Sequence, residues 1–395
     1  MKNVLSLLTL LMCVSAFGQK SIQSIKFDDF YLELAIRNYI DKPTGEFYSS
    51  DLKSLTRLSL ANKGITSLKG LEHVKNLKSL RLDNNQISDL TPLSHLTKLT
   101  NLSLNGNSIV DVSPIGFLKK LESLAIDRNQ ITDISSLHNL KKLKAITANF
   151  NSISTISVVR NWKQLTHFNM AFNQLKEVNP LQNLVKLKGI WIPDNKVKTI
   201  ESLYRLSELE ILILEKNPIA KADVIKNLTN LVQLNLADTK ITDFSPIQNL
   251  KKVGVLVLSK NNIENIDFLK GKSSIEWLDL SDNRITNVSA LSTLKRLRKL
   301  FLSGNQIESI TDLSESSDLR WVVLDNNKLD NLWPLYNLTN LTDIMLYNNP
   351  IKGSKELTEM NLKVIDKIKS DGKNITLNSI EINSIYQMEP SKKLH

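Results

Sequence analysis

Residues 77–98 read LKSLRLDNNQISDLTPLSHLTK, and residues 99–120 read LTNLSLNGNSIVDVSPIGFLKK, so the second stretch repeats the apolar frame of the first after 22 residues. Counted from Lys63, which holds the asparagine slot of the first unit, the chain contains fourteen such units without insertion or deletion. A fixed period of this length predicts a solenoid in which each repeat stacks on the next. The asparagine slot is filled in turn by Asn85, Asn107, Asn129, Asn151, Asn173, Asn195, Asn217, Thr239, Asn261, Asn283, Asn305, Asn327 and Asn349.

Each repeat divides into a short strand and a return segment. The run Leu80-Arg81-Leu82 alternates in polarity, which predicts a strand with one buried face, and strands one repeat apart run parallel. The second half has apolar residues every third position, and its fixed proline indicates a turn or a 3₁₀ segment. The pattern is typical of a right-handed leucine-rich-repeat horseshoe, with a parallel β-sheet on the concave face and short 3₁₀ or turn segments on the convex face. The prolines are Pro92, Pro114, Pro180, Pro246 and Pro334.

The repeated asparagine lies where the chain leaves the strand and turns inward. Its amide offers two donors and an acceptor, so we expect it to satisfy backbone groups that the buried turn leaves unpaired. Thr239 can do part of this, and Lys63 cannot.

The ends of a solenoid expose apolar edges and need caps. Helical spacing after Asp28 and Asp29 predicts an N-terminal cap helix, and similar spacing after Ser354 predicts a C-terminal one that stops at Asp371-Gly372. The run Ile375 to Leu377 predicts a last strand. The expected apolar faces are Leu32, Ala35, Ile36, Tyr39 and Ile40 in the first helix, and Leu357, Met360, Val364 and Ile368 in the second.

Residues 1–18 are predicted to be a signal peptide. Lys2 gives the positive start, Val4 to Val14 the apolar stretch, and Ala16-Phe17-Gly18 the small residues before a cut that leaves Gln19 first. The predicted organisation is therefore signal peptide 1–18, helical cap 19–54, repeats 55–352, and a C-terminal cap with a polar tail at 353–395. The expected location is secreted or extracellular, with a periplasmic or surface-associated place as the alternative.

The single cysteine, Cys13, falls inside the predicted signal peptide. A lipid-attachment cysteine wants a small residue before it, and Met12 is not small, so an ordinary signal-peptide cysteine is favoured. The mature chain would then have no disulfide and no thiolate nucleophile, which for an exported repeat protein favours a bacterial origin.

The chain resembles the internalin type of bacterial leucine-rich-repeat protein over about residues 25–352. The resemblance rests on the cap phrase Phe27-Asp28-Asp29-Phe30 with Ala35, Ile36 and Asp51-Leu52, and on the repeat phrases at residues 85–93 and 107–115. It implies binding of host or surface proteins on the concave face. The family's cell-wall sorting signal and its all-β domain after the repeats are not expected in residues 353–395.

The concave face is predicted to bind a protein partner. Strand residues between the buried leucines point to this face, and its C-terminal two-thirds is rich in large apolar side chains. Exposed apolar patches of this kind usually mark a binding site, although β-branched and aromatic residues also suit strands. The predicted contact residues are Phe150, His167, Phe172, Trp191, Ile213, Val257, Trp277, Phe301, Trp321, Val323, Met345 and Tyr347, and we expect Phe150 and Phe172 to stack.

A basic rim is the alternative site. The formal net charge is +11, and the residue before each repeat's first leucine is often basic. Such a row could hold an acidic polysaccharide or lipopolysaccharide, with nucleic acid less favoured, although a solvated surface that keeps the protein soluble is the favoured explanation. Glu208 and Asp318 interrupt the row. The rim residues are Lys98, Lys120, Lys142, Lys186, Lys252 and Arg296.

Catalysis, cofactors and metals find little support in the sequence. His73, His95 and His138 fall on outer turns of different repeats, and His167 stands alone on the concave face. No triad or metal cluster can be assembled from them. The pairs Asp194-Asn195 and Asp282-Asn283 are better explained by the asparagine slot than by calcium.

The sequence therefore predicts a secreted, non-enzymatic recognition or adhesion protein that binds a macromolecule on its concave face, without a cofactor or a membrane span. The alternative is an envelope protein that binds polyanions or polysaccharides through the basic rim. A cytosolic regulator similar to the leucine-rich subunit of type-1 protein phosphatase shares the repeat length and remains a third interpretation.

Overall fold

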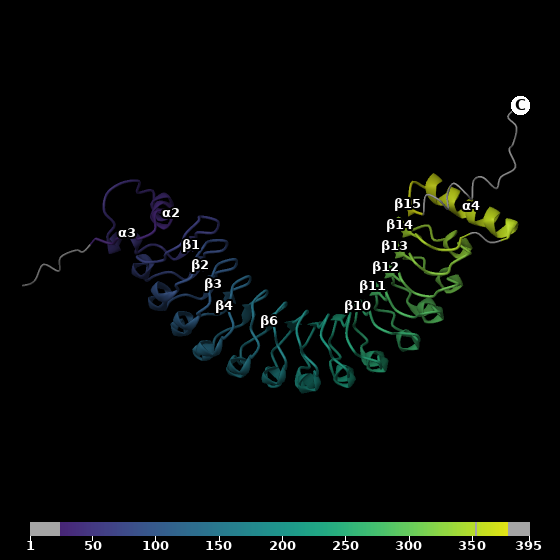
Figure 1. The fold of residues 1–395 in the computed structure, drawn as a ribbon, viewed down its shortest axis with the longest axis horizontal. Coiled ribbons are helices and arrows are strands. Elements are labelled where there is room, and N and C mark those ends of the chain that lie inside the picture. The colour runs from purple at the N-terminus through teal and green to yellow at the C-terminus, as the bar shows by residue number, and fades with distance from the viewer. Residues whose placement is uncertain (1–23, 352–353, 378–395) are drawn as a thin grey trace, which may run out of the picture.

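The computed structural model describes residues 24–351 and 354–377, and within them the chain forms an open arc with one sheet along its inner side (Figure 1). The predicted signal peptide, Cys13 and the polar tail lie outside the described residues. The sheet has 15 parallel strands in sequence order, as the repeat predicted. The strands are β1 (Arg57–Ser59), β2 (Ser79–Arg81), β3 (Asn101–Ser103), β4 (Ser123–Ala125), β5 (Ala145–Thr147), β6 (His167–Asn169), β7 (Gly189–Trp191), β8 (Ile211–Ile213), β9 (Gln233–Asn235), β10 (Val255–Val257), β11 (Trp277–Asp279), β12 (Lys299–Phe301), β13 (Trp321–Val323), β14 (Asp343–Met345) and β15 (Asn374–Thr376).

The return segments carry short 3₁₀ helices on the outer side of the arc (Figure 1). Each of the five repeated prolines stands in the first turn of one of them, where its missing N–H costs nothing. The helices are η1 (Leu71–His73), η2 (Thr91–His95), η3 (Ser113–Phe117), η4 (Ser135–Asn139), η5 (Ser157–Asn161), η6 (Asn179–Leu181), η7 (Glu201–Arg205), η8 (Asp223–Asn227), η9 (Ser245–Asn249), η10 (Asp267–Leu269), η11 (Ser289–Thr293), η12 (Thr311–Leu313) and η13 (Trp333–Leu335).

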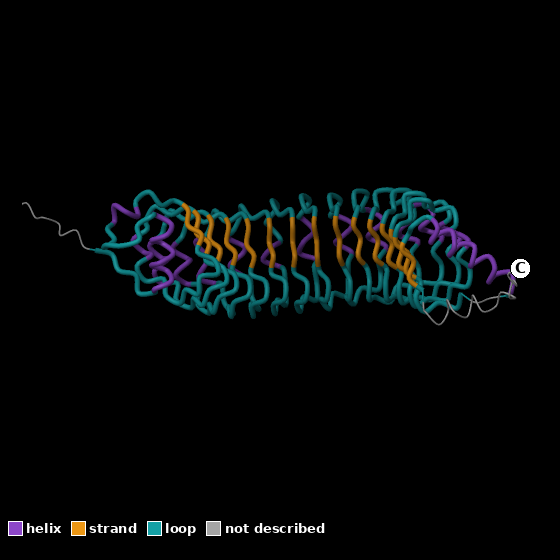
Figure 2. Tube along the Cα trace, turned by 90° about the horizontal axis from the view of Figure 1, so that it is seen from above, coloured by secondary structure: helices purple, strands orange, loops and turns teal. Residues whose placement is uncertain are grey.

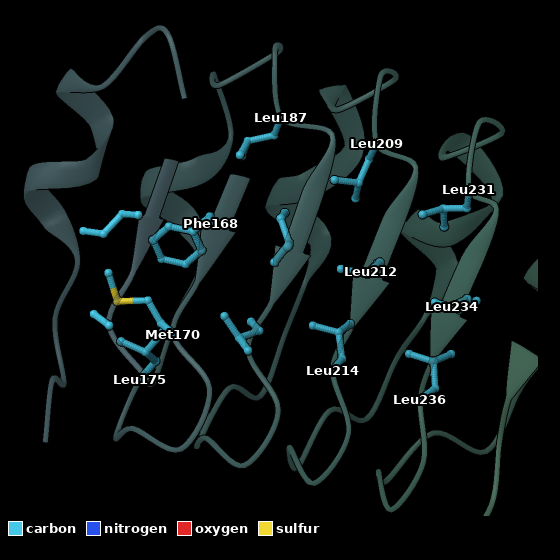
Figure 3. Packing of buried hydrophobic residues seen from close by; sticks show 14 of the residues in the cluster. Phe168, Met170, Leu175, Leu187, Leu209, Leu212, Leu214, Leu231, Leu234 and Leu236 are labelled. Atoms are coloured by element: carbon cyan, nitrogen blue, oxygen red, sulfur yellow. The ribbon is translucent and has the colours of Figure 1, made fainter. Parts of the chain in front are cut away.

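The core is a set of apolar columns between the sheet and the outer helices. Figure 3 shows Leu212 beside Leu234, and Leu214 beside Leu236, in neighbouring repeats. All four side chains are fully buried. Because every repeat supplies the same positions, each buries the apolar side of the next, and the strands cross the inner face as regular rungs (Figure 2).

The asparagine ladder forms as predicted. Asn195 donates from Nδ2 to the carbonyls of Met170 (2.9 Å) and Ile192 (3.2 Å), and its Oδ1 accepts the N–H of Leu175 (2.9 Å). One amide thereby joins two repeats and satisfies groups that no strand or helix reaches. At Thr239 the ladder is weaker, because the hydroxyl makes one backbone bond, to Leu236 O (3.2 Å).

The N-terminal cap contains the predicted helix α2 (Phe30–Ile40) and a second, four-residue helix α3 (Ser49–Leu52). Helix α3 was not predicted from the sequence. Asp29 caps α2 by accepting Leu32 N–H (2.9 Å), and its other oxygen accepts Thr66 N–H (2.7 Å), which ties the cap to the first repeat. Leu32 and Ile36 are buried as expected. The prediction for Tyr39 was wrong, since it is 50% exposed: it lies a turn beyond Ile36 near the end of the helix.

The C-terminal cap is α4 (Lys355–Ser370), which begins after the predicted cap residue Ser354 and is followed by Asp371-Gly372, as expected. Val364 and Ile368 are buried, whereas Leu357 and Met360 are half-buried. Fully buried Asn361 accepts Leu332 N–H (2.8 Å), so the cap supplies an amide to the last repeats much as the ladder does. Strand β15 then pairs with β14, which confirms the predicted last strand.

Candidate functional site

The concave face is lined by the first and third residues of each strand, because the central residue points into the core. Its N-terminal part is polar, with Ser59, Arg81 and Ser103 on β1 to β3. From β7 onward, aromatic and branched side chains dominate. The predicted contact residues therefore lie on one continuous surface, and the structure gathers several of them into three clusters.

The first cluster lies on β11 to β13 and contains Trp277, Phe301 and Trp321. The Phe301 ring centroid is 5.9 Å from that of Trp277 and 6.2 Å from that of Trp321. Trp277 is 40% exposed, and the other two are half-buried, because their rings cover one another. Sequence analysis missed Lys299, whose Nζ lies 4.7 Å from the Trp277 centroid and 5.6 Å from the Trp321 centroid. The strand register could have identified Lys299, because it pairs Trp277, Lys299 and Trp321 on adjacent strands. We call these four residues the tryptophan cluster.

The second cluster pairs His167 on β6 with Trp191 on β7. Their rings stack with centroids 6.0 Å apart and planes 12° apart. The Trp191 ring lies flat over Gly189, where a Cβ would collide with the indole. Gly189 therefore makes room for Trp191 to lie along the sheet.

The third cluster is the pair Phe150 and Phe172, which lie at the edge of the concave face, where the chain leaves strands β5 and β6. The rings stack as predicted, with centroids 4.3 Å apart and planes 8° apart, and Arg128 lies 5.3 Å from the Phe150 centroid. Both phenylalanines have φ of +54°. This left-handed conformation suits glycine and asparagine and strains a bulky residue. The same slot is left-handed in other repeats, where Arg128, Lys216 and Lys260 occupy it, so the strain belongs to the repeat. What distinguishes the two phenylalanines is that they remain 45% and 40% exposed while stacked on each other.

The other predicted contact residues differ in exposure. Tyr347 is 50% exposed, and Val257 and Met345 are half-buried. Ile213 and Val323, however, are only 9% and 8% exposed. Ile213 lies between Trp191 and Asn235 on the neighbouring strands, and Val323 lies between Phe301 and Met345. These two therefore offer a partner little area and mainly support the surface.

The basic rim is exposed along its length but is not a free row of charge. Lys98, Lys186 and Lys252 each donate to an amide oxygen one repeat earlier, at 2.6 to 2.7 Å. Arg296 pairs with Glu276 at 3.3 Å. A second column of charged residues lies two positions after the rim residues. Within it, acids pair with basic residues of the neighbouring repeat, as Glu122 does with Lys144 (2.7 Å). Lys120 and Lys142 have no acidic partner within the described residues.

A second polar ladder, which sequence analysis missed, runs along the polar end of the sheet. Asp83 accepts Asn105 N–H (3.0 Å), Asn105 accepts Asp127 N–H (2.8 Å), and Asp127 accepts Asn149 N–H (2.7 Å). Burial raises the pKa of Asp127, although the Asn149 N–H and the Thr147 hydroxyl oppose the shift. These acids are committed to the backbone, so they form structure and not a catalytic pair.

Catalytic and metal chemistry gains no support from the geometry. His73, His95 and His138 lie on η1, η2 and η4, on the convex side. Among the residues the structure describes, no three His, Cys, Asp or Glu side chains gather as metal ligands. Over the same residues, no helix is long and apolar enough to cross a bilayer.

Comparison with known proteins agrees with this architecture. A family model described as "Leucine Rich repeats (2 copies)" matches residues 53–95, 97–137 and 273–315. No curated protein matches the chain. Among solved structures, the internalin inlF of Listeria monocytogenes superposes with a TM-score of 0.79 at 29% identity, over 82% of this chain and 98% of that one.

Two further structures extend the comparison. Internalin C2 of Listeria monocytogenes is 31% identical, with a TM-score of 0.52, over 61% of this chain and all of its own (100%). The ectodomain of the Arabidopsis thaliana receptor kinase GASSHO1/SCHENGEN3 is 25% identical, with a TM-score of 0.62, over 74% of this chain and 41% of that one. It was solved in complex with CASPARIAN STRIP INTEGRITY FACTOR 2.

Proposed function

Because the chain belongs to the internalin-type leucine-rich-repeat proteins, we propose that it is an exported, non-enzymatic recognition protein that binds a protein partner on its concave face. Leucine-rich repeats of this type are typically protein-interaction modules, and the plant receptor ectodomain described above was solved with its own partner bound. The predicted signal peptide at residues 1–18 is the reason to expect the partner outside the cytoplasm.

The tryptophan cluster carries the proposal. Trp277 keeps 40% of its surface exposed on a face where serine or threonine would serve the strand equally well. Large exposed aromatics are uncommon on a soluble surface without a partner, and tryptophan is among the preferred anchors of protein interfaces. The second and third clusters would extend the same contact surface toward the middle of the arc.

The test compares two sets of variants in affinity capture from envelope fractions and host-cell extracts. Trp277→Ala with Trp321→Ala removes the aromatic anchors, whereas Lys120→Ser with Lys142→Ser removes two rim charges that lack acidic partners. We expect a captured protein that is lost with the first pair, retained with the second, and held at moderate ionic strength, because burial of aromatic surface is little screened by salt. Capture that depends on the lysines and collapses with salt would replace this proposal with polyanion binding at the rim. Melting curves of both pairs exclude unfolding as the cause.

A further inference from the structure

The tryptophan cluster contains a cation without an anion. Lys299 Nζ has aromatic neighbours on two sides, and within the described residues neither an ion pair nor a hydrogen-bond acceptor reaches it. Sandwiching between indoles stabilises an ammonium group through the electrostatics of the ring faces. Lys299 is half-buried, so part of its side chain remains accessible to a partner.

The nearby acids are already engaged elsewhere. Glu276 pairs with Arg296 (3.3 Å) and Arg298 (3.0 Å). Asp279 accepts Ser281 N–H (2.9 Å), and Asp343 accepts the Thr342 hydroxyl (2.7 Å) and the Asn374 amide (2.9 Å). None of these acids forms an ion pair with Lys299 within the described residues, so the ammonium group keeps the capacity to pair with a carboxylate brought by a partner.

The cluster also holds an unsatisfied donor. Trp321 Nε1 is buried and has no hydrogen-bond partner, whereas buried indole N–H groups usually find one. Together with Lys299, the cluster therefore contains two donor groups without an acceptor in the described residues.

We propose that the tryptophan cluster selects its protein partner by an acidic side chain, Asp or Glu, whose carboxylate pairs with Lys299 while an adjacent apolar side chain packs on Trp277 and Phe301. A single carboxylate fits better than a phosphate group, because Asp279 on β11 and Asp343 on β14 repel a doubly charged anion more strongly than a singly charged one. The inference rests on the proposed function, since it names the chemistry of the partner at the same surface.

The experiment selects a phage-displayed random peptide library against the purified full chain, against Lys299→Met and against Trp277→Ala. Methionine keeps most of the apolar stem of lysine and removes the charge, and Lys299→Arg is the matched control that retains it. We expect wild-type peptides to share an Asp or Glu beside an aromatic or aliphatic residue. That acidic preference should disappear with Lys299→Met and persist with Lys299→Arg.

A peptide from the wild-type selection and its Asp→Asn or Glu→Gln form then complete a double-mutant cycle by fluorescence anisotropy. Neutralising the peptide acid should weaken wild-type binding on the order of 30-fold, mainly through faster dissociation, and should leave Lys299→Met binding nearly unchanged. Peptides that need Trp277 but show no acidic preference would overturn this inference and leave the proposed function standing. A wild-type selection that gives no binders, or gives peptides that bind equally well to Trp277→Ala, would overturn both.

Discussion

Ala171 and Pro193 occupy the same position in consecutive repeats, the position of Asn149 in the second polar ladder. The Ala171 side chain cannot accept a hydrogen bond, and Pro193, the residue that would donate to it, has no N–H. The second polar ladder reaches Ala171 through Asn149, whose Oδ1 accepts Ala171 N–H (2.7 Å), and it ends there. Elsewhere in this ladder each side chain accepts the N–H of the following repeat. The ladder thus ends at a pair of residues that leaves no N–H unsatisfied.

The first prediction concerns this ladder end. Pro193→Ala restores an N–H that no side chain accepts, and we expect a loss of about 1 kcal/mol in the free energy of unfolding. Adding Ala171→Asn to the same chain should recover most of the loss, because the new amide can accept that N–H as Asn149 does one repeat earlier. Urea unfolding of the single and double variants measures both effects. A double variant no more stable than Pro193→Ala would mean that the loss comes from the freer unfolded chain instead.

The second prediction uses the asparagine ladder in both directions. Asn195→Leu removes four backbone hydrogen bonds of a buried amide and should cost about 1–3 kcal/mol. Thr239→Asn should stabilise the chain by about 1 kcal/mol. Ile219 N–H now donates within its own turn to Asn217 O (2.8 Å), and a new amide oxygen could accept it as in the other repeats. Unfolding midpoints shifting in opposite directions would support the ladder argument, and unchanged midpoints would contradict it.

The third prediction concerns Lys272, a buried lysine that occupies a column filled by Leu250 and Leu294 in the adjacent repeats. Its Nζ donates to Gln248 O (2.7 Å) and Leu250 O (2.6 Å). Burial, aided by the charge of Lys251, lowers the pKa of Lys272 from 10.5 to about 8. The folded state therefore binds its proton less tightly than the unfolded state does, so stability should rise as the pH increases from about 8 to 10.5.

Lys272→Leu should remove this contribution to the pH dependence and stabilise the chain at neutral pH by about 1–3 kcal/mol, less the loss of the two carbonyl contacts. Urea unfolding at pH 7 and at a pH near 10 measures the difference between variant and wild type. A variant less stable than wild type at neutral pH would show that the carbonyl contacts outweigh the cost of burying the charge.

The fourth prediction separates stability from binding at the third cluster. Phe172→Asn replaces a strained left-handed phenylalanine by a residue that tolerates this conformation, as Asn84 and Asn326 do in other repeats. We expect a melting temperature equal to or above that of wild type, together with weaker capture of the partner. Ser152→Ala, a change at an exposed position nearby, serves as the control and should alter neither quantity. A clear drop in melting temperature would assign Phe172 to structure.

The sequence predicted the architecture well because each repeat restates the same physical constraints. The strand alternation, the first-turn prolines and the asparagine slot each recur in several repeats, so a coincidental match in one repeat does not affect the predicted architecture. The stack of Phe150 on Phe172 followed from their equal spacing alone. The four-residue helix α3 has no periodicity long enough to detect, and it escaped prediction for that reason.

The features that were missed depend on comparison across strands. Lys299 looks unremarkable within its own repeat and gains meaning only between Trp277 and Trp321. Lys272 stands out only when its column is compared with Leu250 and Leu294. The low exposure of Ile213 and Val323 depends on the orientations of neighbouring side chains, which the repeat pattern does not specify.

Because the 22-residue period is uninterrupted, the distance between two points on the concave face is set by the number of repeats between them. Trp191 on β7 and Trp277 on β11 are four strands apart, so about 19 Å of sheet separates them at the usual strand spacing. Removing or duplicating one whole repeat between them would change that distance in steps of about 4.8 Å while leaving every other contact type in place. The spacing of two contact points on a partner can therefore be matched by counting repeats, without redesigning a single side chain.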